Sequence, residues 1–178
     1  MIRVLILLSV LCLVSCDQAH LRQLVREIFV VEENVVDTSA YKVIGIKDGD
    51  TIVILQDSSE QVVRLGHIDC PENRQPFGTR AKQFVSDACF GEYVTLQVDP
   101  KNKYDRNKRL IAEIILPDGS KLNRELVRKG LAWHFERYSN DNSYSALEQG
   151  ARRNKVGVWS EPNPIAPWEW RKMPKGKK

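Results

Sequence analysis

The chain has 178 residues, a length that suits one domain better than two. Apolar residues make up 42% of it and charged residues 28%, so a core of useful size is possible without disulfide bonds. The net charge of +4 is compatible with a polyanionic partner, but it is too small to identify one by itself.

The N-terminal segment reads as an export signal rather than as part of the fold. An apolar run over residues 4–14 follows Arg3 and is too short to span a bilayer as a permanent helix, which predicts a signal peptide over residues 1–15. Its end, Leu-Val-Ser-Cys at residues 13–16, resembles a bacterial lipobox. We therefore expect Cys16 to carry a lipid that tethers an exported protein to a membrane, on its periplasmic or extracellular face. An ordinary signal peptide with a chance cysteine is the alternative.

Three further segments follow. Residues 16–39 form a lead-in, either a short amphipathic helix or a spacer. Residues 40–160 hold the folded domain. Residues 161–178 are rich in Pro, Trp and Lys, and we expect an extended basic tail. Its end, residues 171–178, either contacts nucleic acid or anionic lipid or is simply solvated.

Within the domain, short β-branched runs separated by turn residues predict strands, and apolar residues at helical spacing predict helices. The expected strands are 42–46, 51–56, 61–66, 93–98 and 109–116, and the expected helices are 79–90, 122–129 and 145–155. Ser145 and Glu148 have the spacing of a capping box for the last helix. Five strands with a helix between the third and the fourth match an OB-fold barrel, a mainly β, α+β fold with about three helices. Such barrels commonly bind oligonucleotides.

Two cysteines remain in the mature domain, Cys70 and Cys89. Outside the cytoplasm they could pair in a disulfide. Alternatively, Cys89 is a small core residue on the apolar stripe of its helix.

Four acidic residues cluster around two turns. Asp48 and Asp50 bracket a glycine in a hairpin turn, and Asp69 and Glu72 follow the third expected strand. Carboxylate oxygens suit Ca²⁺, and adjacent strands would bring the two pairs to one end of the sheet. On spacing alone, however, turn-forming and solvated residues explain the pattern better.

Two arginines are candidates for binding phosphate. Arg64 lies within an apolar strand and Arg109 begins another, and the guanidinium fork suits phosphate oxygens. Each could instead be a surface residue at the barrel rim. No pair of histidines has zinc-ligand spacing, and no Walker A loop or serine-nucleophile elbow is present.

The order of these motifs resembles the staphylococcal nuclease (thermonuclease) family, over about residues 41–160. The matching motifs are Asp-Gly-Asp-Thr at 48–51, Val-Arg-Leu at 63–65, Ile-Asp-Cys-Pro-Glu at 68–72, Asp-Arg-Asn-Lys-Arg at 105–109, the helix at 122–132 and Val-Trp-Ser at 158–160.

The resemblance implies a calcium-dependent endonuclease that acts on single-stranded or frayed DNA or RNA, and we expect a monomer. It implies that Asp50, Asp69 and the backbone carbonyl of Cys70 hold Ca²⁺, with Asp48 orienting the site. Glu72 would be the general base or position the water. Finally, it implies that Arg64 and Arg109 clamp the phosphate and that the 5′-oxygen leaves, so that 3′-phosphate products form.

Some positions depart from the family pattern. Asn107-Lys108 stands where a Tyr-Gly is usual, so the orientation of the Arg109 side chain is less certain than in the family pattern. Glu136 replaces a tyrosine that packs on the nucleotide, whereas Tyr138 matches the second such position. Trp133 either stacks on a base instead or belongs to the core. The alternative function is a non-catalytic OB-fold module that binds nucleic acid or protein.

Overall fold

The computed structural model describes the backbone of residues 35–174 and the side chains from residue 39 onward. The predicted signal peptide, the lipid attachment at Cys16 and most of the lead-in lie outside these residues. Across residues 35–174, no helix is both long and apolar enough to cross a membrane.

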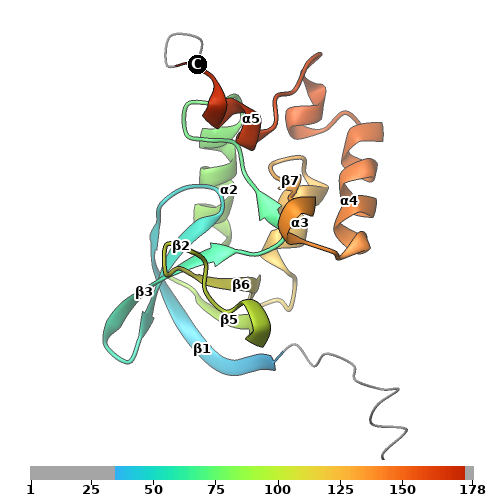
Figure 1. Ribbon diagram of the computed structural model, residues 1–178. Helices are drawn as coiled ribbons and strands as arrows, with labels where there is room; N and C mark the ends of the chain where they lie inside the picture. Colours follow the sequence, from blue (N-terminus) through green and yellow to red (C-terminus); the bar gives the residue numbers. More distant parts are fainter. Residues whose placement is uncertain (1–34, 175–178) are drawn as a thin grey trace, which may run out of the picture. The chain divides into compact units, whose positions relative to one another are not determined.

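Five strands close into a barrel in the order β1-β2-β3-β6-β5, with β5 pairing back to β1 (Figure 1). The strands are β1 Val35–Ile46, β2 Thr51–Gln56, β3 Ser59–Leu65, β5 Tyr93–Val98 and β6 Leu110–Ile115. All pairs are antiparallel except β3 and β6, which run parallel where the barrel closes. The predicted five-stranded barrel with helices is therefore confirmed.

Two strands begin before their predicted starts. β1 begins at Val35 rather than at Lys42, because one long strand pairs with β5 at its start and with β2 at its end. β3 begins at Ser59 because the hairpin turn needs only Asp57 and Ser58, both of which have positive φ (47° and 65°). Two consecutive residues with positive φ give the tight turn that matches strand twist, so the longer predicted turn is wrong.

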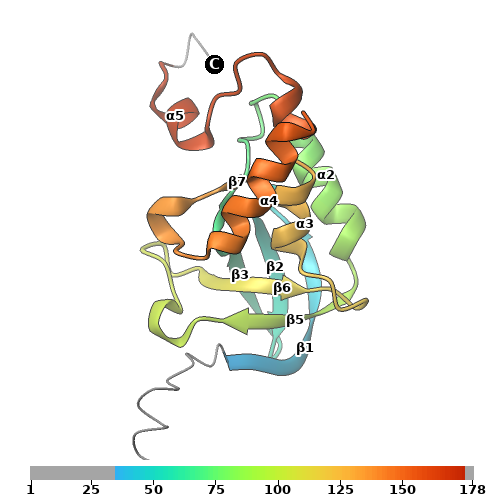
Figure 2. The same ribbon diagram turned by 90° about the vertical axis from the view of Figure 1, so that its right-hand side faces the viewer.

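The helices lie together at one end of the barrel (Figure 2). They are α2 Gly78–Cys89, α3 Leu122–Arg128 and α4 Asn142–Arg153. Two short 3-10 helices lie in connections, η1 Pro100–Asn102 between β5 and β6 and η2 Glu136–Tyr138 between β7 and α4. A second small sheet pairs β4 (Ile68–Asp69) with β7 (Trp133–His134).

The start of α4 differs from the predicted capping box. Asp141 caps the helix, because its Oδ1 accepts a hydrogen bond from the Ser143 amide at 2.9 Å. Ser145 and Glu148 bind His134 instead, through the Nδ1 atom (3.0 Å) and the backbone amide (3.0 Å) respectively. Tertiary contacts with β7 therefore use the side chains that the sequence pattern assigned to capping.

One buried amide holds the parallel closure of the barrel. Asn123 of α3 is fully buried; it accepts a hydrogen bond from the Ile114 amide at 3.0 Å. Its own amide donates to the carbonyls of Gly66 (3.0 Å) and Ala112 (3.1 Å). Because both carbonyls belong to the β3 and β6 side of the barrel, this single side chain ties the two strands to α3.

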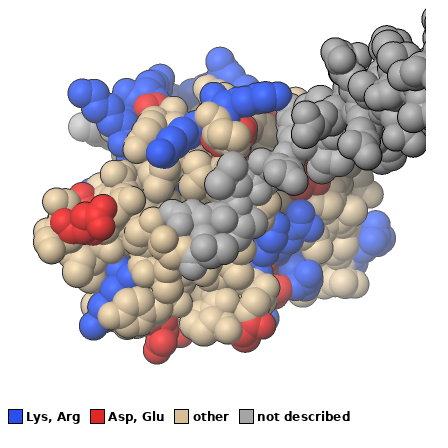
Figure 3. Space-filling view, turned by 90° about the horizontal axis from the view of Figure 1, so that it is seen from below, with Lys and Arg blue, Asp and Glu red and all other residues tan. Residues whose placement is uncertain are grey.

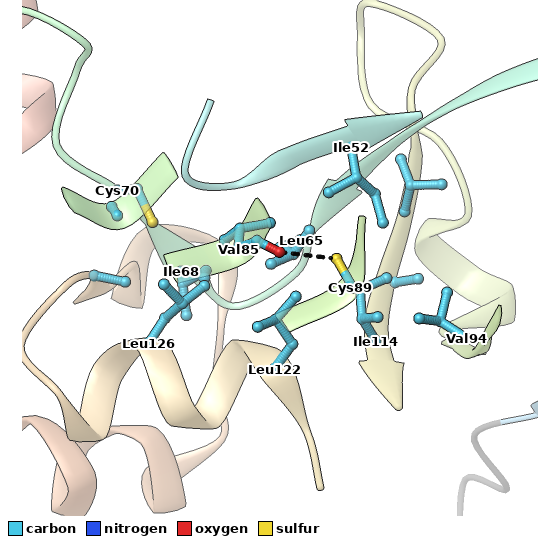
Figure 4. Close-up of a cluster of buried hydrophobic side chains, with 14 of the residues drawn as sticks. Ile52, Leu65, Ile68, Cys70, Val85, Cys89, Val94, Ile114, Leu122 and Leu126 are labelled. Atoms are coloured by element: carbon cyan, nitrogen blue, oxygen red, sulfur yellow. Dashed lines mark hydrogen bonds between the residues drawn. The ribbon is translucent and has the colours of Figure 1, made fainter. Parts of the chain in front are cut away.

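The apolar core fills the barrel and continues under α2 and α3, and both cysteines belong to it (Figure 4). Both are free, so the disulfide that the sequence left open is not present. The Cys70 thiol donates to the Gly49 carbonyl, and the Cys89 thiol donates to the Val85 carbonyl, each at 3.2 Å. Burial raises the pKa of the Cys89 thiol to about 12.

The C-terminal segment folds instead of extending. It forms η3 (Gly157–Ser160) and α5 (Pro167–Lys172). Gly130 and Gly157 meet where this segment begins, both with positive φ (63° and 58°). A Cβ atom at Gly157 would lie 2.2 Å from the Gly130 carbonyl oxygen, which leaves no room for any other residue there.

Candidate active site

Two buried carboxylates form the centre of the site. Asp50 ends the turn between β1 and β2 and is 7% exposed, and Asp69 ends β4 and is 3% exposed. The Cys70 amide donates to Asp50 Oδ2 at 2.8 Å, and the Thr51 hydroxyl donates to Asp50 Oδ1 at 3.2 Å. The closing of the barrel therefore brings together two acids that lie 19 residues apart in the chain.

Arg64 of β3 joins the two carboxylates. Its Nη2 lies 3.2 Å from Asp50 Oδ2 and 3.1 Å from Asp69 Oδ1. The carbonyls of Leu65 and Ile68 accept further hydrogen bonds from the same guanidinium. This position explains why Arg64 has apolar neighbours in the sequence: the side chain is largely buried, and acids and carbonyls bind its guanidinium.

Burial raises the pKa of both carboxyl groups above their ordinary values. Arg64 opposes this effect at Asp50, and hydrogen bonds from Arg171 together with the charge of Arg64 oppose it at Asp69, but in neither case do they outweigh burial. The two acids thus retain an unfavourable negative charge that a further cation would offset.

Arg109 lies just before β6 and is held by Asp105. Its Nε is 2.8 Å and its Nη2 is 2.7 Å from Asp105 Oδ2, while the Asp105 Oδ1 accepts the Arg109 backbone amide at 2.9 Å. Arg109 Nη1 donates to the Thr51 hydroxyl at 3.3 Å, and that hydroxyl donates to Asp50. The loop therefore directs Arg109 toward the acid pair even though Asn107 and Lys108 replace the usual family residues; Lys108 has a positive φ of 59°.

Glu72 lies in the segment that leads from β4 to α2, with a half-exposed side chain (43%). Arg171 of α5 binds its Oε1 at 2.8 Å and also binds Asp69 Oδ2 at 2.6 Å. Figure 1 draws α5 beside this segment. The tail that we expected to be extended thus reaches the acid cluster.

The remaining predicted residues have clear positions. Asp48 shapes the turn, because its Oδ1 accepts the Asp50 amide at 3.0 Å. Tyr138 is 70% exposed, packs edge-on against Phe135 and has the Arg137 guanidinium over its ring at 5.6 Å. Trp133 is buried against Trp159, with ring centroids 4.2 Å apart, and belongs to the core rather than to a stacking surface.

The donor atoms of the site fit a calcium ion. Asp50 and Asp69 supply carboxylate oxygens, which hard cations prefer. Among residues 39–174, no three His, Cys, Asp or Glu side chains are arranged as a complete metal site. A backbone carbonyl such as that of Cys70, together with water, would have to complete the coordination.

An open hollow of about 520 Å³ adjoins Arg109 and Thr51. Lys47, Lys108, Asp48 and Glu60 also line it, so three basic and two acidic side chains surround the hollow. On the face shown in Figure 3, both basic and acidic side chains occur among the described residues.

Comparisons with known proteins show which family the chain belongs to. The profile of the family described as staphylococcal nuclease homologue matches residues 62–161. An uncharacterized endonuclease of Escherichia coli is 33% identical over 130 residues, which cover 73% of this chain and 83% of that protein.

The chain belongs to the staphylococcal nuclease family. A micrococcal nuclease of Shigella flexneri is 36% identical over 141 residues, covering 75% of this chain and 81% of that protein. An uncharacterized endonuclease of Haemophilus influenzae is 33% identical over 135 residues, covering 75% and 74%.

Sequence reasoning missed three residues of the site: Thr51, Asp105 and Arg171. Asp105 had a visible signal, because an acid four residues before an arginine often pairs with it. Thr51 stood inside a recognised motif but was given no role. Arg171 had no local signal, since its position depends on how α5 docks.

Proposed function

We propose that this member of the staphylococcal nuclease family is a calcium-dependent endonuclease that hydrolyses phosphodiester bonds in DNA or RNA. Family membership supports nuclease activity in general. The observation that carries the rest is the buried pair Asp50 and Asp69, bridged by Arg64, with Glu72 close enough for Arg171 to bind it and Asp69 together.

Asp50, Asp69 and the carbonyl of Cys70 would hold the ion. When bound, Ca²⁺ would polarise the phosphoryl group and offset its negative charge. With so few protein ligands the affinity should be weak, on the order of 10⁻⁴–10⁻³ M. Asp48 keeps Asp50 in place through the bond from its carboxylate to the Asp50 amide.

Glu72 is the candidate base. Its carboxylate would orient a water molecule and accept its proton as the water oxygen attacks phosphorus. The bond from phosphorus to the 5′-oxygen then breaks, and that oxygen takes up a proton. The products are a 3′-phosphate on one fragment and a 5′-hydroxyl on the other.

Arg64 and Arg109 would stabilise the charge that develops on the phosphoryl oxygens. Both side chains are already held in place, Arg64 by backbone carbonyls and Arg109 by Asp105, so substrate binding costs them little conformational entropy. The hollow beside Arg109 would take the adjoining nucleotide, and Tyr138 offers an exposed ring for a base of single-stranded or frayed substrate.

The protein would act as an exported, lipid-anchored monomer. The Leu-Val-Ser-Cys pattern at residues 13–16 supports this proposal, with Cys16 as the lipidated residue. Incorporation of labelled palmitate that disappears in a Cys16→Ala variant would test it; incorporation that persists would refute it.

The activity test uses the purified full-length chain and single-stranded DNA or RNA, with millimolar Ca²⁺ and then with a chelator. We expect cleavage only with Ca²⁺, and 3′-phosphate ends on the fragments. Glu72→Gln and Arg64→Lys should each lower turnover by about 10²–10³-fold, because each removes a group that acts on the transition state.

Matched controls are available on the same chain. Glu92→Gln and Arg153→Lys make the same chemical changes at exposed positions and should leave turnover within about twofold. A folded wild-type protein that binds nucleic acid but never cleaves it would instead favour the non-catalytic binding module.

A further inference from the structure

The C-terminal helix α5 is fixed to the domain by specific contacts. The Trp168 ring stacks on Phe135 with centroids 5.2 Å apart and planes at 6°, and it meets Trp133 edge-on at 5.7 Å. Gln75 donates to the Ile165 carbonyl at 2.6 Å. These contacts hold the helix beside the segment that carries Glu72.

The docked helix places one guanidinium on two acids of the site. Arg171 Nη2 and Nη1 lie 2.6 Å and 3.3 Å from the two oxygens of Asp69, and Nη1 also lies 2.8 Å from Glu72 Oε1. Burial opposes the charge of Arg171, but the hydrogen bonds to Asp69 and Glu72 outweigh it and raise its pKa. Asp69 is thus bound by two arginines, Arg64 and Arg171.

This arrangement conflicts with the binding of a divalent cation at Asp69. The guanidinium donates to the same carboxylate oxygens that a metal would use, and like charges repel at such short range. The same contact neutralises Glu72, which as a base has to present a free lone pair to water. A single residue therefore opposes both the ion and the base.

We propose that Arg171 sets the calcium affinity of the site: in the metal-free protein its guanidinium occupies the oxygens of Asp69 and Glu72, and calcium has to displace it. This inference rests on the proposed function. The match to the family profile ends at residue 161, so α5 lies beyond the matched region.

The test is calcium titration of the purified full-length protein by calorimetry, without substrate. Arg171→Gln should bind Ca²⁺ about tenfold more tightly than wild type, within the roughly 5–150-fold range of couplings between sites. Lys172→Gln removes the same charge from the same helix, where Lys172 pairs with Glu169 at 2.9 Å, and should change the affinity less than about twofold.

A second variant covers the case in which Arg171→Gln fails to fold. Arg171→Lys keeps the charge but lacks the fork that spans two carboxylates, so its affinity should lie between those of wild type and Arg171→Gln. Unchanged or weaker binding by the Arg171 variants would overturn the inference. If the wild type still binds Ca²⁺ and cleaves, the proposed function survives that result; if no variant binds Ca²⁺, both proposals fall.

Discussion

In two buried acidic clusters of this protein, the pKa of the carboxyl group shifts in opposite directions. Asp50 in the active site and Glu113 on β6 are equally buried, each 7% exposed. Burial raises the pKa of Asp50 above its ordinary value. At Glu113, burial also acts to raise the pKa, but hydrogen bonds from Lys121 and Tyr144 outweigh it, and the pKa is lowered.

The difference lies in what the chain supplies to each carboxylate. Glu113 is bound by Lys121 at 2.6 Å, by the Tyr144 hydroxyl and by Arg124 at 3.5 Å. Asp50 shares the guanidinium of Arg64 with Asp69, and Asp69 also binds Arg171. A carboxylate whose partners outweigh burial stabilises the fold, whereas a buried carboxylate whose pKa stays raised is suited to bind a cation from solution.

Of the variants that test this comparison, Asp50→Asn should have the largest effect, on cleavage and on stabilisation by Ca²⁺. We expect cleavage to fall by at least about 10²-fold and added Ca²⁺ to stop raising the unfolding temperature, because a calcium ligand is lost. Stability without calcium should stay within about 1 kcal/mol of wild type, since the amide keeps an acceptor for the Cys70 amide and removes a charge that burial disfavours. Cleavage assays and thermal unfolding with and without Ca²⁺ measure these outcomes.

A calcium-free Asp50→Asn protein that unfolds many degrees below wild type would contradict the comparison. Asp50 would then be a structural acid of the same kind as Glu113. Asp57→Asn, a change of the same type in the exposed turn between β2 and β3, serves as the control for charge alone.

Glu113→Gln should do the opposite: it should lower stability and leave cleavage nearly unchanged, and its effect should be smaller than that of Asp50→Asn. We expect the free energy of unfolding to fall by about 1–3 kcal/mol at pH 7, because Lys121 and Arg124 lose their buried partner. Cleavage by the protein that remains folded should change little. Denaturant unfolding and cleavage rates measured at one temperature would separate the two effects.

The cost of Glu113→Gln should also depend on pH. Because folding lowers the pKa of Glu113 from its ordinary 4.5, its contribution is fully present above about that pH and is lost as the pH falls through the folded-state value. The difference in stability between variant and wild type should therefore shrink on acidification below pH 4.5. A difference that stays constant down to pH 3 would mean that the effect is one of packing.

The sequence predicted the elements of the fold better than their pairing. Short β-branched and apolar runs between turn residues marked all five barrel strands. Such runs do not say which strands are neighbours, so the parallel contact of β3 and β6 could be expected only from the resemblance to a known barrel. The role of Asn123 in that closure has no local signal. Ser145 and Glu148 fitted a capping pattern, yet both bind His134, which lies more than ten residues earlier in the chain.

The residues of the site also fall into those that the sequence could identify and one that it could not. Asp50, Arg64, Asp69 and Arg109 could be named from motifs because each lies at a fixed place relative to a strand. Arg171 could not, because composition predicts an extended tail for a segment rich in Pro and Trp. Its position follows from the surface formed by Phe135 and Trp133, which exists only after the domain has folded.

The contact of Gly130 with Gly157 has a consequence for how this chain can vary. A side chain at Gly130 would lie 2.2 Å from the Val156 carbonyl oxygen, and one at Gly157 would lie equally close to the Gly130 carbonyl. Neither glycine can change alone, and changing both together makes the overlap worse. Sequence drift is therefore barred at two positions that carry no chemistry, while the surface of α4 between them remains free to diversify. A saturation library scored for folded protein should show both glycines as invariant, whereas the exposed positions of α4 between them should vary freely.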